Sequence, residues 1–231
     1  MFCFPYAGVG PSIYFPWQVH LPPKVELFVI QSPGREGRFR EASIQTMEII
    51  VREISQAIAK YLDKPFVTFG HSLGALTSFE TVRVLRREFG KSPAHFFVSG
   101  YRAPQLPDPN SPMHSLPEKL FVEELRRRYD GLPAVILEDQ DLLDIFLPAI
   151  RADMTVSETY TYVPEVTFDF PITAYGGIQD SIVNQESLNA WGQQTHGQFR
   201  LKMLPGDHFF LENARADLLQ DVRTTFLGLL K

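Results

Sequence analysis

Gly70-His71-Ser72-Leu73-Gly74 is the stretch that decides the fold, because it lies between a predicted strand and a predicted helix. Residues 65–69 before it form a short apolar run, as in a parallel strand covered on both faces. After it, apolar side chains recur at helical spacing up to residue 89, and Gly90 is suited to follow the end of a helix. The pattern G-x-S-x-G in this position predicts a sharp turn that presents the Ser72 hydroxyl above the sheet, with glycines where side chains would clash.

The rest of the chain alternates between strand-like and helix-like segments. Strand-like runs predict further strands at residues 25–31, 95–99, 171–175 and 199–204. Apolar residues at helical spacing predict helices over residues 44–61, with Ser43 as the N-cap, and over residues 218–230. This alternation predicts the α/β class, with a mostly parallel sheet covered by helices on both faces. The length suits a single domain over residues 1–231.

One segment interrupts the alternation. Five prolines between residues 104 and 117 exclude regular structure there. Helical patterns follow at residues 117–129, 139–147 and 148–159, with Pro117, Pro133 and Pro148 near their starts. These helices carry more apolar surface than they can bury among themselves. We therefore expect an insertion of about residues 112–162 to pack over the carboxyl ends of the strands as a substrate-covering lid, a plain structural excursion being the alternative.

Composition excludes several classes of protein. The formal net charge of −5 argues against nucleic acid as a partner. No apolar run reaches the length of about 18 residues that spans a membrane, and the N-terminus lacks the basic start of a signal peptide. Cys3 is the only cysteine, and its apolar neighbours predict a buried strand residue. A chain without an internal disulfide fits a reducing compartment, so we expect a cytoplasmic protein that does not bind membranes.

A serine hydroxyl needs a base to become a nucleophile, and in this class of fold an acid and then a histidine follow the serine along the chain. Of the six histidines, His71 is fixed inside the turn, and three others precede the expected acid. His196 lies among polar residues before a strand, as in a surface turn. His208 follows the strand predicted at residues 199–204, where a loop would reach the carboxyl edge of the sheet. His208 is therefore the candidate base.

The candidate acid is Asp180, which follows the strand predicted at residues 171–175 on a turn with two adjacent glycines. Asp207 is a poor orienting group, because it is adjacent to His208 and neighbouring side chains diverge. Asp169 precedes its strand and so lies at the wrong end of the sheet, and Asp153 belongs to the insertion. The alternative role of Asp180 is the N-cap of a helix.

The oxyanion formed during acyl transfer needs two preorganised N–H donors. The first is the N–H of Leu73, the residue after the serine. The glycine-bearing loop Phe4-Pro5-Tyr6-Ala7-Gly8 is placed to supply the second. We assign the Ala7 N–H to this role, with the Gly8 N–H as the alternative.

Five motifs in this order resemble type II thioesterases, the discrete editing hydrolases of polyketide and nonribosomal peptide synthesis. They are residues 70–74, the Phe4–Gly8 loop, Pro33-Gly34-Arg35-Glu36, the segment 176–180 and Gly206-Asp207-His208-Phe209-Phe210-Leu211. The resemblance covers essentially the whole chain, including Arg151-Ala152-Asp153 in the insertion. It implies an α/β-hydrolase fold in which Ser72 is the nucleophile, Asp180 the acid and His208 the base. The chain departs from the family pattern at Tyr6, where the family usually has His, and at Leu73, where it often has Met.

The resemblance also implies the substrate and the partner. The substrates would be acyl thioesters on the phosphopantetheine arm of acyl or peptidyl carrier proteins, hydrolysed by a monomer without a cofactor or metal of its own. Carrier proteins are acidic, so we expect them to dock on a basic patch. The candidate patches are Arg35, Arg38 and Arg40; Arg126, Arg127 and Arg128; or Arg83, Arg86, Arg87 and Lys91. Two alternatives are a carboxylesterase or lipase acting on small free esters and a non-catalytic relative that binds a ligand.

Overall fold

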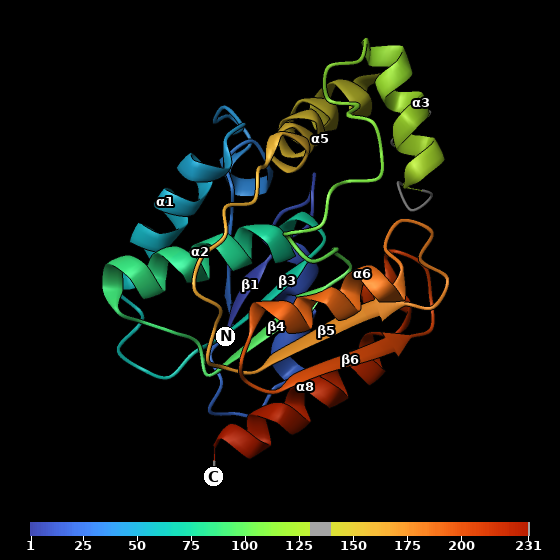
Figure 1. The fold of residues 1–231 in the computed structure, drawn as a ribbon. Coiled ribbons are helices and arrows are strands. Elements are labelled where there is room, and N and C mark those ends of the chain that lie inside the picture. The colour runs from blue at the N-terminus through green and yellow to red at the C-terminus, as the bar shows by residue number, and fades with distance from the viewer. Residues whose placement is uncertain (130–139, 231) are drawn as a thin grey trace.

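The computed structural model describes residues 1–129 and 140–230, which are built around a six-stranded sheet (Figure 1). The strand order is β2-β1-β3-β4-β5-β6, and all five pairings between neighbours are parallel. The strands are β1 (Phe2–Phe4), β2 (Phe28–Val29), β3 (Val67–His71), β4 (His95–Ser99), β5 (Ile172–Gly177) and β6 (Phe199–Leu204). The predicted α/β class with a parallel sheet is confirmed.

Helices cover both faces of the sheet, because successive strand residues point to opposite sides. In β4, Phe96 and Val98 join an apolar cluster with α1 (Met47–Ala59), α2 (Leu73–Phe89) and the 3₁₀ helix η3 (Ala190–Gln194). Phe97 joins a second cluster on the other face with η1 (Pro11–His20) and α8 (Arg215–Leu229). Figure 1 shows α1 and α2 on one side of the sheet and α8 on the other. Three short helices complete these layers: η2 (Glu36–Arg38), α6 (Gln185–Asn189) and α7 (Phe210–Asn213).

The strand order reverses next to β1. The chain runs from β1 outward to the edge strand β2 and then returns to β3 on the other side of β1. The loops that follow β1 and β3 therefore diverge at the carboxyl edge of the sheet. Open α/β sheets bind their ligands in the crevice that such a reversal creates.

The segment between β4 and β5 carries α3 (Glu118–Arg128) and α5 (Gln140–Thr159). The two helices lie beyond the carboxyl ends of the strands (Figure 1). They share a third apolar cluster that includes Phe121, Leu125, Leu147, Ile150 and Met154. The sequence predicted separate helices at residues 139–147 and 148–159, and this is wrong, because α5 continues through Pro148. Pro133 lies outside the described residues.

Two smaller expectations also differ from the structure. β2 covers only Phe28–Val29 and not residues 25–31, because the Val25 N–H donates to the Pro22 carbonyl and the Leu27 N–H to the side chain of Gln18. Helix α1 begins at Met47 after Thr46, so Ser43 is not its N-cap. The remaining predicted strands and helices agree with the structure to within about two residues at most ends, and Gly90 ends α2 in the left-handed conformation. In the described part of the chain, no helix is long and apolar enough to cross a membrane.

Candidate active site

Ser72 lies on the turn between β3 and α2 in a backbone conformation that side chains rarely adopt, with φ 51° and ψ −125°. Its N–H donates to the Ser99 carbonyl on β4 at 2.8 Å, which holds the turn to the sheet. A Cβ atom at Gly70 would lie 2.1 Å from the Gly74 carbonyl oxygen, and one at Gly74 would lie 2.1 Å from the Phe4 carbonyl oxygen. The two glycines therefore allow the strand, the helix and the β1 loop to approach closely, as the sequence predicted.

The structure brings the side chains of Ser72, His208 and Asp180 together in one hydrogen-bonded chain. His208 Nε2 lies 3.1 Å from Ser72 Oγ, and His208 Nδ1 lies 2.9 Å from Asp180 Oδ2. The other Asp180 oxygen accepts the N–H groups of Ile182 and Val183 at 2.8 and 3.0 Å. The carboxylate is fully buried and the imidazole nearly so. The arrangement allows Ser72 to transfer its proton to an oriented imidazole.

The histidines and acids that were set aside on sequence grounds are not part of this hydrogen-bonded chain. His71 is buried with its Nδ1 at 2.9 Å from Ser99 Oγ. Burial, and then the nearby His208, hold the pKa of His71 well below its ordinary value, so its ring is neutral. His196 is exposed, and Asp207 accepts the N–H of Phe209.

The two candidate donors on the β1 loop differ in whether their N–H is already used. The Gly8 N–H donates to Asp153 Oδ2 at 2.7 Å. The Ala7 N–H donates to no group within residues 1–129 and 140–230. Leu73 is the first residue of α2, where an N–H has no partner inside the helix. The geometry therefore favours Ala7 over Gly8 as the partner of Leu73.

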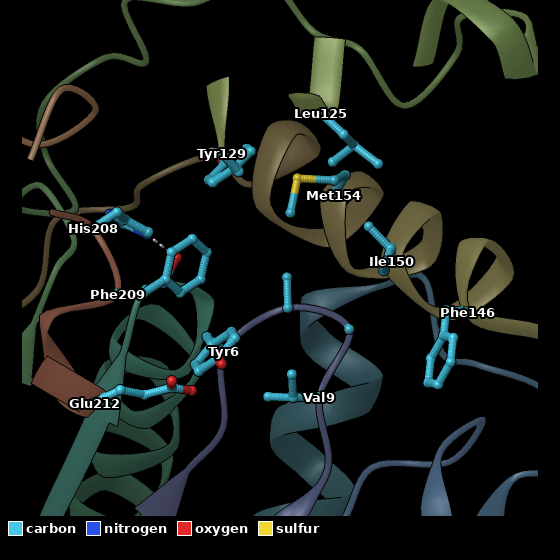
Figure 2. Close-up of a pocket in the computed structure, with 13 residues that line it drawn as sticks. Tyr6, Val9, Leu125, Tyr129, Phe146, Ile150, Met154, His208, Phe209 and Glu212 are labelled. Carbon is cyan, nitrogen blue, oxygen red and sulfur yellow. Dashed lines mark hydrogen bonds between the residues drawn. The ribbon is translucent and has the colours of Figure 1, made fainter. Parts of the chain in front are cut away.

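A cavity of about 250 Å³ opens beside Ser72 (Figure 2). Apolar side chains supply most of its wall: Ala7, Val9, Leu125, Tyr129, Phe146, Ile150, Met154 and Phe209. Tyr6 and Glu212 also line it, and burial, followed by the charge of Glu212, raises the pKa of Tyr6 to about 12. Of these wall residues, Ala7 was assigned a role from the sequence, as an oxyanion donor. The others were not predicted individually, and the signal for them in the sequence is the apolar repeat that places Ile150 and Met154 one turn apart on α5.

A second, smaller cavity of about 40 Å³ adjoins the same serine. It shares Ser72, Tyr129, Met154 and His208 with the first. Its other wall residues combine polar side chains, among them Arg102, Asn110, Arg128, Ser157 and Glu158, with apolar ones such as Ile182 and Val183. Ser72 thus lies between a mostly apolar cavity and a smaller, more polar one.

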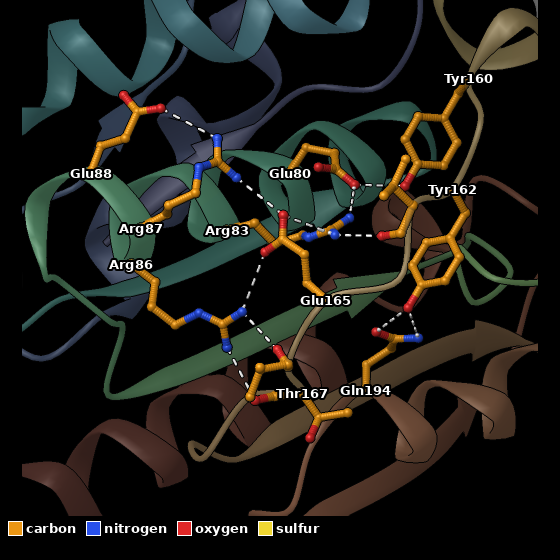
Figure 3. Close-up of polar contacts among 12 residues, drawn as sticks. Glu80, Arg83, Arg86, Arg87, Glu88, Tyr160, Tyr162, Glu165, Thr167 and Gln194 are labelled. Atoms are coloured by element: carbon orange, nitrogen blue, oxygen red, sulfur yellow. Dashed lines mark hydrogen bonds and ion pairs between the residues drawn. The ribbon is translucent and has the colours of Figure 1, made fainter.

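Most of the predicted basic patches are not free surfaces. Arg83, Arg86 and Arg87 of α2 each form an ion pair with Glu165, and the side chain of Arg83 is buried. Figure 3 shows this cluster, which fastens the segment after α5 to α2. In the first patch, Arg35 is buried against Asp153 and Arg38 pairs with Glu41. On α3, Arg126 and Arg127 are both exposed, and Arg127 pairs with Glu124 on the same helix.

Comparisons with known proteins agree with this geometry. The thioesterase-domain family matches residues 1–226. The gramicidin S biosynthesis protein GrsT of Aneurinibacillus migulanus is 40% identical over 220 residues, which cover 95% of this chain and 86% of that protein. The solved RedJ thioesterase from the prodiginine pathway of Streptomyces coelicolor is 37% identical, with a TM-score of 0.89 over 96% of this chain and 84% of that one.

A further solved structure, ClbQ from the colibactin NRPS/PKS pathway, has a TM-score of 0.93 and 29% identity, and covers 99% of this chain and 96% of its own. The fold shared with these structures is the α/β-hydrolase fold. The resemblance found in the sequence is thus confirmed over nearly the full length of the chain. This chain belongs to the thioesterase family, whose enzymes hydrolyse thioesters.

Proposed function

We propose that the protein hydrolyses acyl or aminoacyl thioesters held on the phosphopantetheine arm of acyl or peptidyl carrier proteins. In this proposal Ser72 is the nucleophile, His208 the base and Asp180 the acid that orients it. The observation that carries the proposal is the hydrogen-bonded chain from Asp180 through His208 to Ser72, which ends beside an apolar cavity. The relatives named for gramicidin S, prodiginine and colibactin biosynthesis support a role in polyketide or nonribosomal peptide synthesis.

The reaction follows from the geometry in two halves. Ser72 Oγ attacks the thioester carbonyl carbon while His208 Nε2 accepts its proton, and the N–H groups of Ala7 and Leu73 stabilise the oxyanion. The carbon–sulfur bond then breaks, and the departing thiol takes the proton from His208. A water molecule activated by His208 next attacks acyl-Ser72 and releases the carboxylic acid. These groups and water complete the reaction, so the enzyme needs no cofactor of its own.

The two cavities beside Ser72 suit the two halves of such a substrate. The apolar cavity, with a volume of about 250 Å³, would hold the acyl group. We therefore expect acyl chains of short or medium length. The smaller, more polar cavity, of about 40 Å³, would receive only the part of the pantetheine arm next to the thioester, with Arg102 and Arg128 near its wall.

Helices α3 and α5 act as the lid in this proposal, since both supply wall residues of the apolar cavity. The carrier protein would dock beside the cavity on the exposed face of α3 that bears Arg126 and Arg127. To test this, Arg126→Glu with Arg127→Glu should raise KM for a carrier-bound substrate several-fold, and the effect should shrink at high salt. The matched control is Arg223→Glu, an exposed arginine on α8. An unchanged KM would exclude this docking face.

One experiment separates this function from hydrolysis of free esters. The same acyl group is presented as a carrier-bound thioester and as a small soluble ester, to wild type and to Ser72→Ala. We expect kcat/KM to be at least about 100-fold higher for the carrier-bound thioester, and Ser72→Ala to be inactive on both. Equal or higher kcat/KM for the free ester would identify a carboxylesterase instead. Failure of a serine-directed phosphonate to label Ser72 would favour a non-catalytic protein.

A further inference from the structure

Asp153 is a buried carboxylate on α5 that takes no part in the proposed reaction. Its two oxygens accept two guanidinium N–H groups of Arg35, at 2.6 and 3.1 Å. Both side chains of this ion pair are more than nine-tenths buried. Oδ2 of Asp153 also accepts the Gly8 N–H at 2.7 Å, so one carboxylate joins α5 to the loop after β1. Buried carboxylates are costly unless they are paired and hydrogen-bonded as this one is.

The loop after β1 and helix α5 also touch directly at Gly8. Gly8 has φ +80°, and a Cβ atom there would lie 2.6 Å from Cγ1 of Ile150, one turn before Asp153 on α5. The absence of a side chain at Gly8 therefore allows its N–H to reach the carboxylate. Ile150 also lines the apolar cavity.

The motif Pro33-Gly34-Arg35-Glu36 holds the same loop from its other side. Arg35 donates to the Pro33 carbonyl as well as to Asp153. Glu36 accepts the hydroxyl of Ser12, just beyond the loop, at 2.7 Å. The loop is thus fixed at Gly8 and at Ser12 by residues from two other segments of the chain.

These contacts determine the direction of the Ala7 N–H. The bond from Gly8 to Asp153 fixes the peptide after Ala7. The Val9 N–H donates to the Tyr6 carbonyl at 3.4 Å, and that carbonyl belongs to the same peptide group as the Ala7 N–H. With its own peptide group and the following one both held by hydrogen bonds, the Ala7 N–H is restricted in direction. A donor for an oxyanion must be oriented before the reaction, because reorientation during it would cost activation free energy.

We propose that Asp153 is a positioning residue that aims the Ala7 N–H at the oxyanion, with Arg35 as its counter-ion. This inference rests on the role given to Ala7 in the proposed function. It makes α5 both a wall of the acyl cavity, through Ile150 and Met154, and the support of the loop that holds the oxyanion.

The test compares Asp153→Ala with the matched control Asp221→Ala. Asp221 on α8 likewise accepts two N–H groups of one arginine, Arg200, together with the hydroxyl of Tyr175, but it lines neither cavity beside Ser72. For Asp153→Ala we expect kcat to fall roughly 10- to 100-fold while KM for the carrier-bound thioester stays within about threefold. An acyl trifluoromethyl ketone, which forms an oxyanion on Ser72, should lose affinity by the same factor, whereas a thioether analogue without a carbonyl should not. Asp221→Ala should leave kcat, KM and the affinities for both inhibitors unchanged.

Two further arms keep the result interpretable. If Asp153→Ala does not fold, Asp153→Asn, which preserves the side-chain volume, should show a smaller loss in the same direction. Each variant is also assayed on p-nitrophenyl acetate. If the wild type hydrolyses this ester but not carrier-bound thioesters, the proposed function is refuted, and the ester assay still tests the role of Asp153. An unchanged kcat in a folded Asp153 variant would overturn the positioning role. An equal loss in Asp221→Ala, or equal loss of affinity for the thioether, would overturn it as well.

Discussion

The two oxygens of the Asp180 carboxylate form hydrogen bonds with different groups. Oδ1 accepts the N–H groups of Ile182 and Val183, which fixes the plane of the carboxylate. Oδ2 faces Nδ1 of His208 and is an acceptor only, so the ring proton of the neutral histidine belongs on Nδ1. Nε2 is then free to accept the proton of Ser72.

Asp180→Asn should therefore impair the reaction without unfolding the protein. The amide oxygen can replace Oδ1 toward Ile182 and Val183, but the amide N–H then faces Nδ1 and favours the wrong tautomer of His208. We expect kcat on a carrier-bound thioester to fall by about 10³- to 10⁴-fold with little change in KM. The control is Asp207→Asn, next to His208 in the sequence, which should change kcat less than threefold. A kcat above a tenth of the wild-type value would contradict this role of Asp180.

The sequence predicted those residues of the site that lie just after the end of a strand. Ser72, Asp180 and His208 each follow a strand that ends at the same edge of the sheet, so their order along the chain was enough to bring them together. Asp153 and Arg35 are 118 residues apart, and neither lies at the end of a strand. Only the packing of α5 against the segment that follows β2 brings those two side chains together, and no local pattern encodes it.

Helix α5 shows how packing outweighs a local rule. Pro148 lacks an N–H and typically costs a helix interior about 3 kcal/mol, which is why a break was predicted there. The apolar residues Leu143, Leu147, Ile150 and Met154 nevertheless keep helical spacing across it and pack in one cluster. That uninterrupted spacing was the signal in the sequence for a single helix. The arginines of α2 show a limit of the opposite kind, because composition does not reveal that Glu165 pairs with them.

At the same scale, the wall that α5 gives to the cavity should set the acyl-chain length. Ile150→Trp adds bulk inside the cavity and should lower kcat/KM for an octanoyl thioester at least about tenfold, since each buried methylene contributes about 0.8 kcal/mol. The kcat/KM for the acetyl thioester should change less than about threefold. Ile145→Trp, on the exposed face of the same helix, is the control and should alter neither. Equal losses on both acyl groups would refute the assignment of this cavity to the acyl chain.

For the molecule as a whole, the order of strands and helices was predictable because a parallel sheet buries both faces and its strands are continuous apolar runs. This holds for the fully buried interior strands β3, β4 and β5, which the structure places within two residues of the predicted bounds. It fails at the edge strand β2, where the Val25 N–H donates to the Pro22 carbonyl and the Leu27 N–H to the Gln18 side chain on η1. The distinction between edge and interior depends on the whole topology, which a single segment does not contain.

Two buried histidines predict how the stability of the whole fold responds to acid. Burial, followed by the charge of Arg200, lowers the pKa of His95 to about 4, and burial, followed by the nearby His208, holds the pKa of His71 well below its usual range. The unfolded chain binds these protons near pH 6.5 and the folded chain does not. Their contribution to stability is therefore complete above about pH 7 and is lost as the pH falls.

From pH 6 to pH 5 we expect the free energy of unfolding to fall by roughly 2 to 3 kcal/mol, since each histidine contributes about 1.4 kcal/mol per pH unit. Urea denaturation at several pH values measures this slope. His95→Gln, which keeps a partner for Thr173, should remove about half of it. A slope that is absent in the wild type, or unchanged in His95→Gln, would contradict the prediction.

The central claim is that the acyl group passes through a covalent bond to Ser72, and mass spectrometry of the quenched reaction tests it most directly. A thiolate leaves readily, so deacylation should limit turnover and acyl-Ser72 should accumulate. Wild type mixed with an acyl-carrier thioester and quenched in acid within milliseconds to seconds should carry the mass of the acyl group on the peptide that contains Ser72. Ser72→Ala should show neither this mass nor turnover. Turnover by Ser72→Ala at the wild-type rate, or wild-type turnover with no acyl group on Ser72 at any time, would contradict the account.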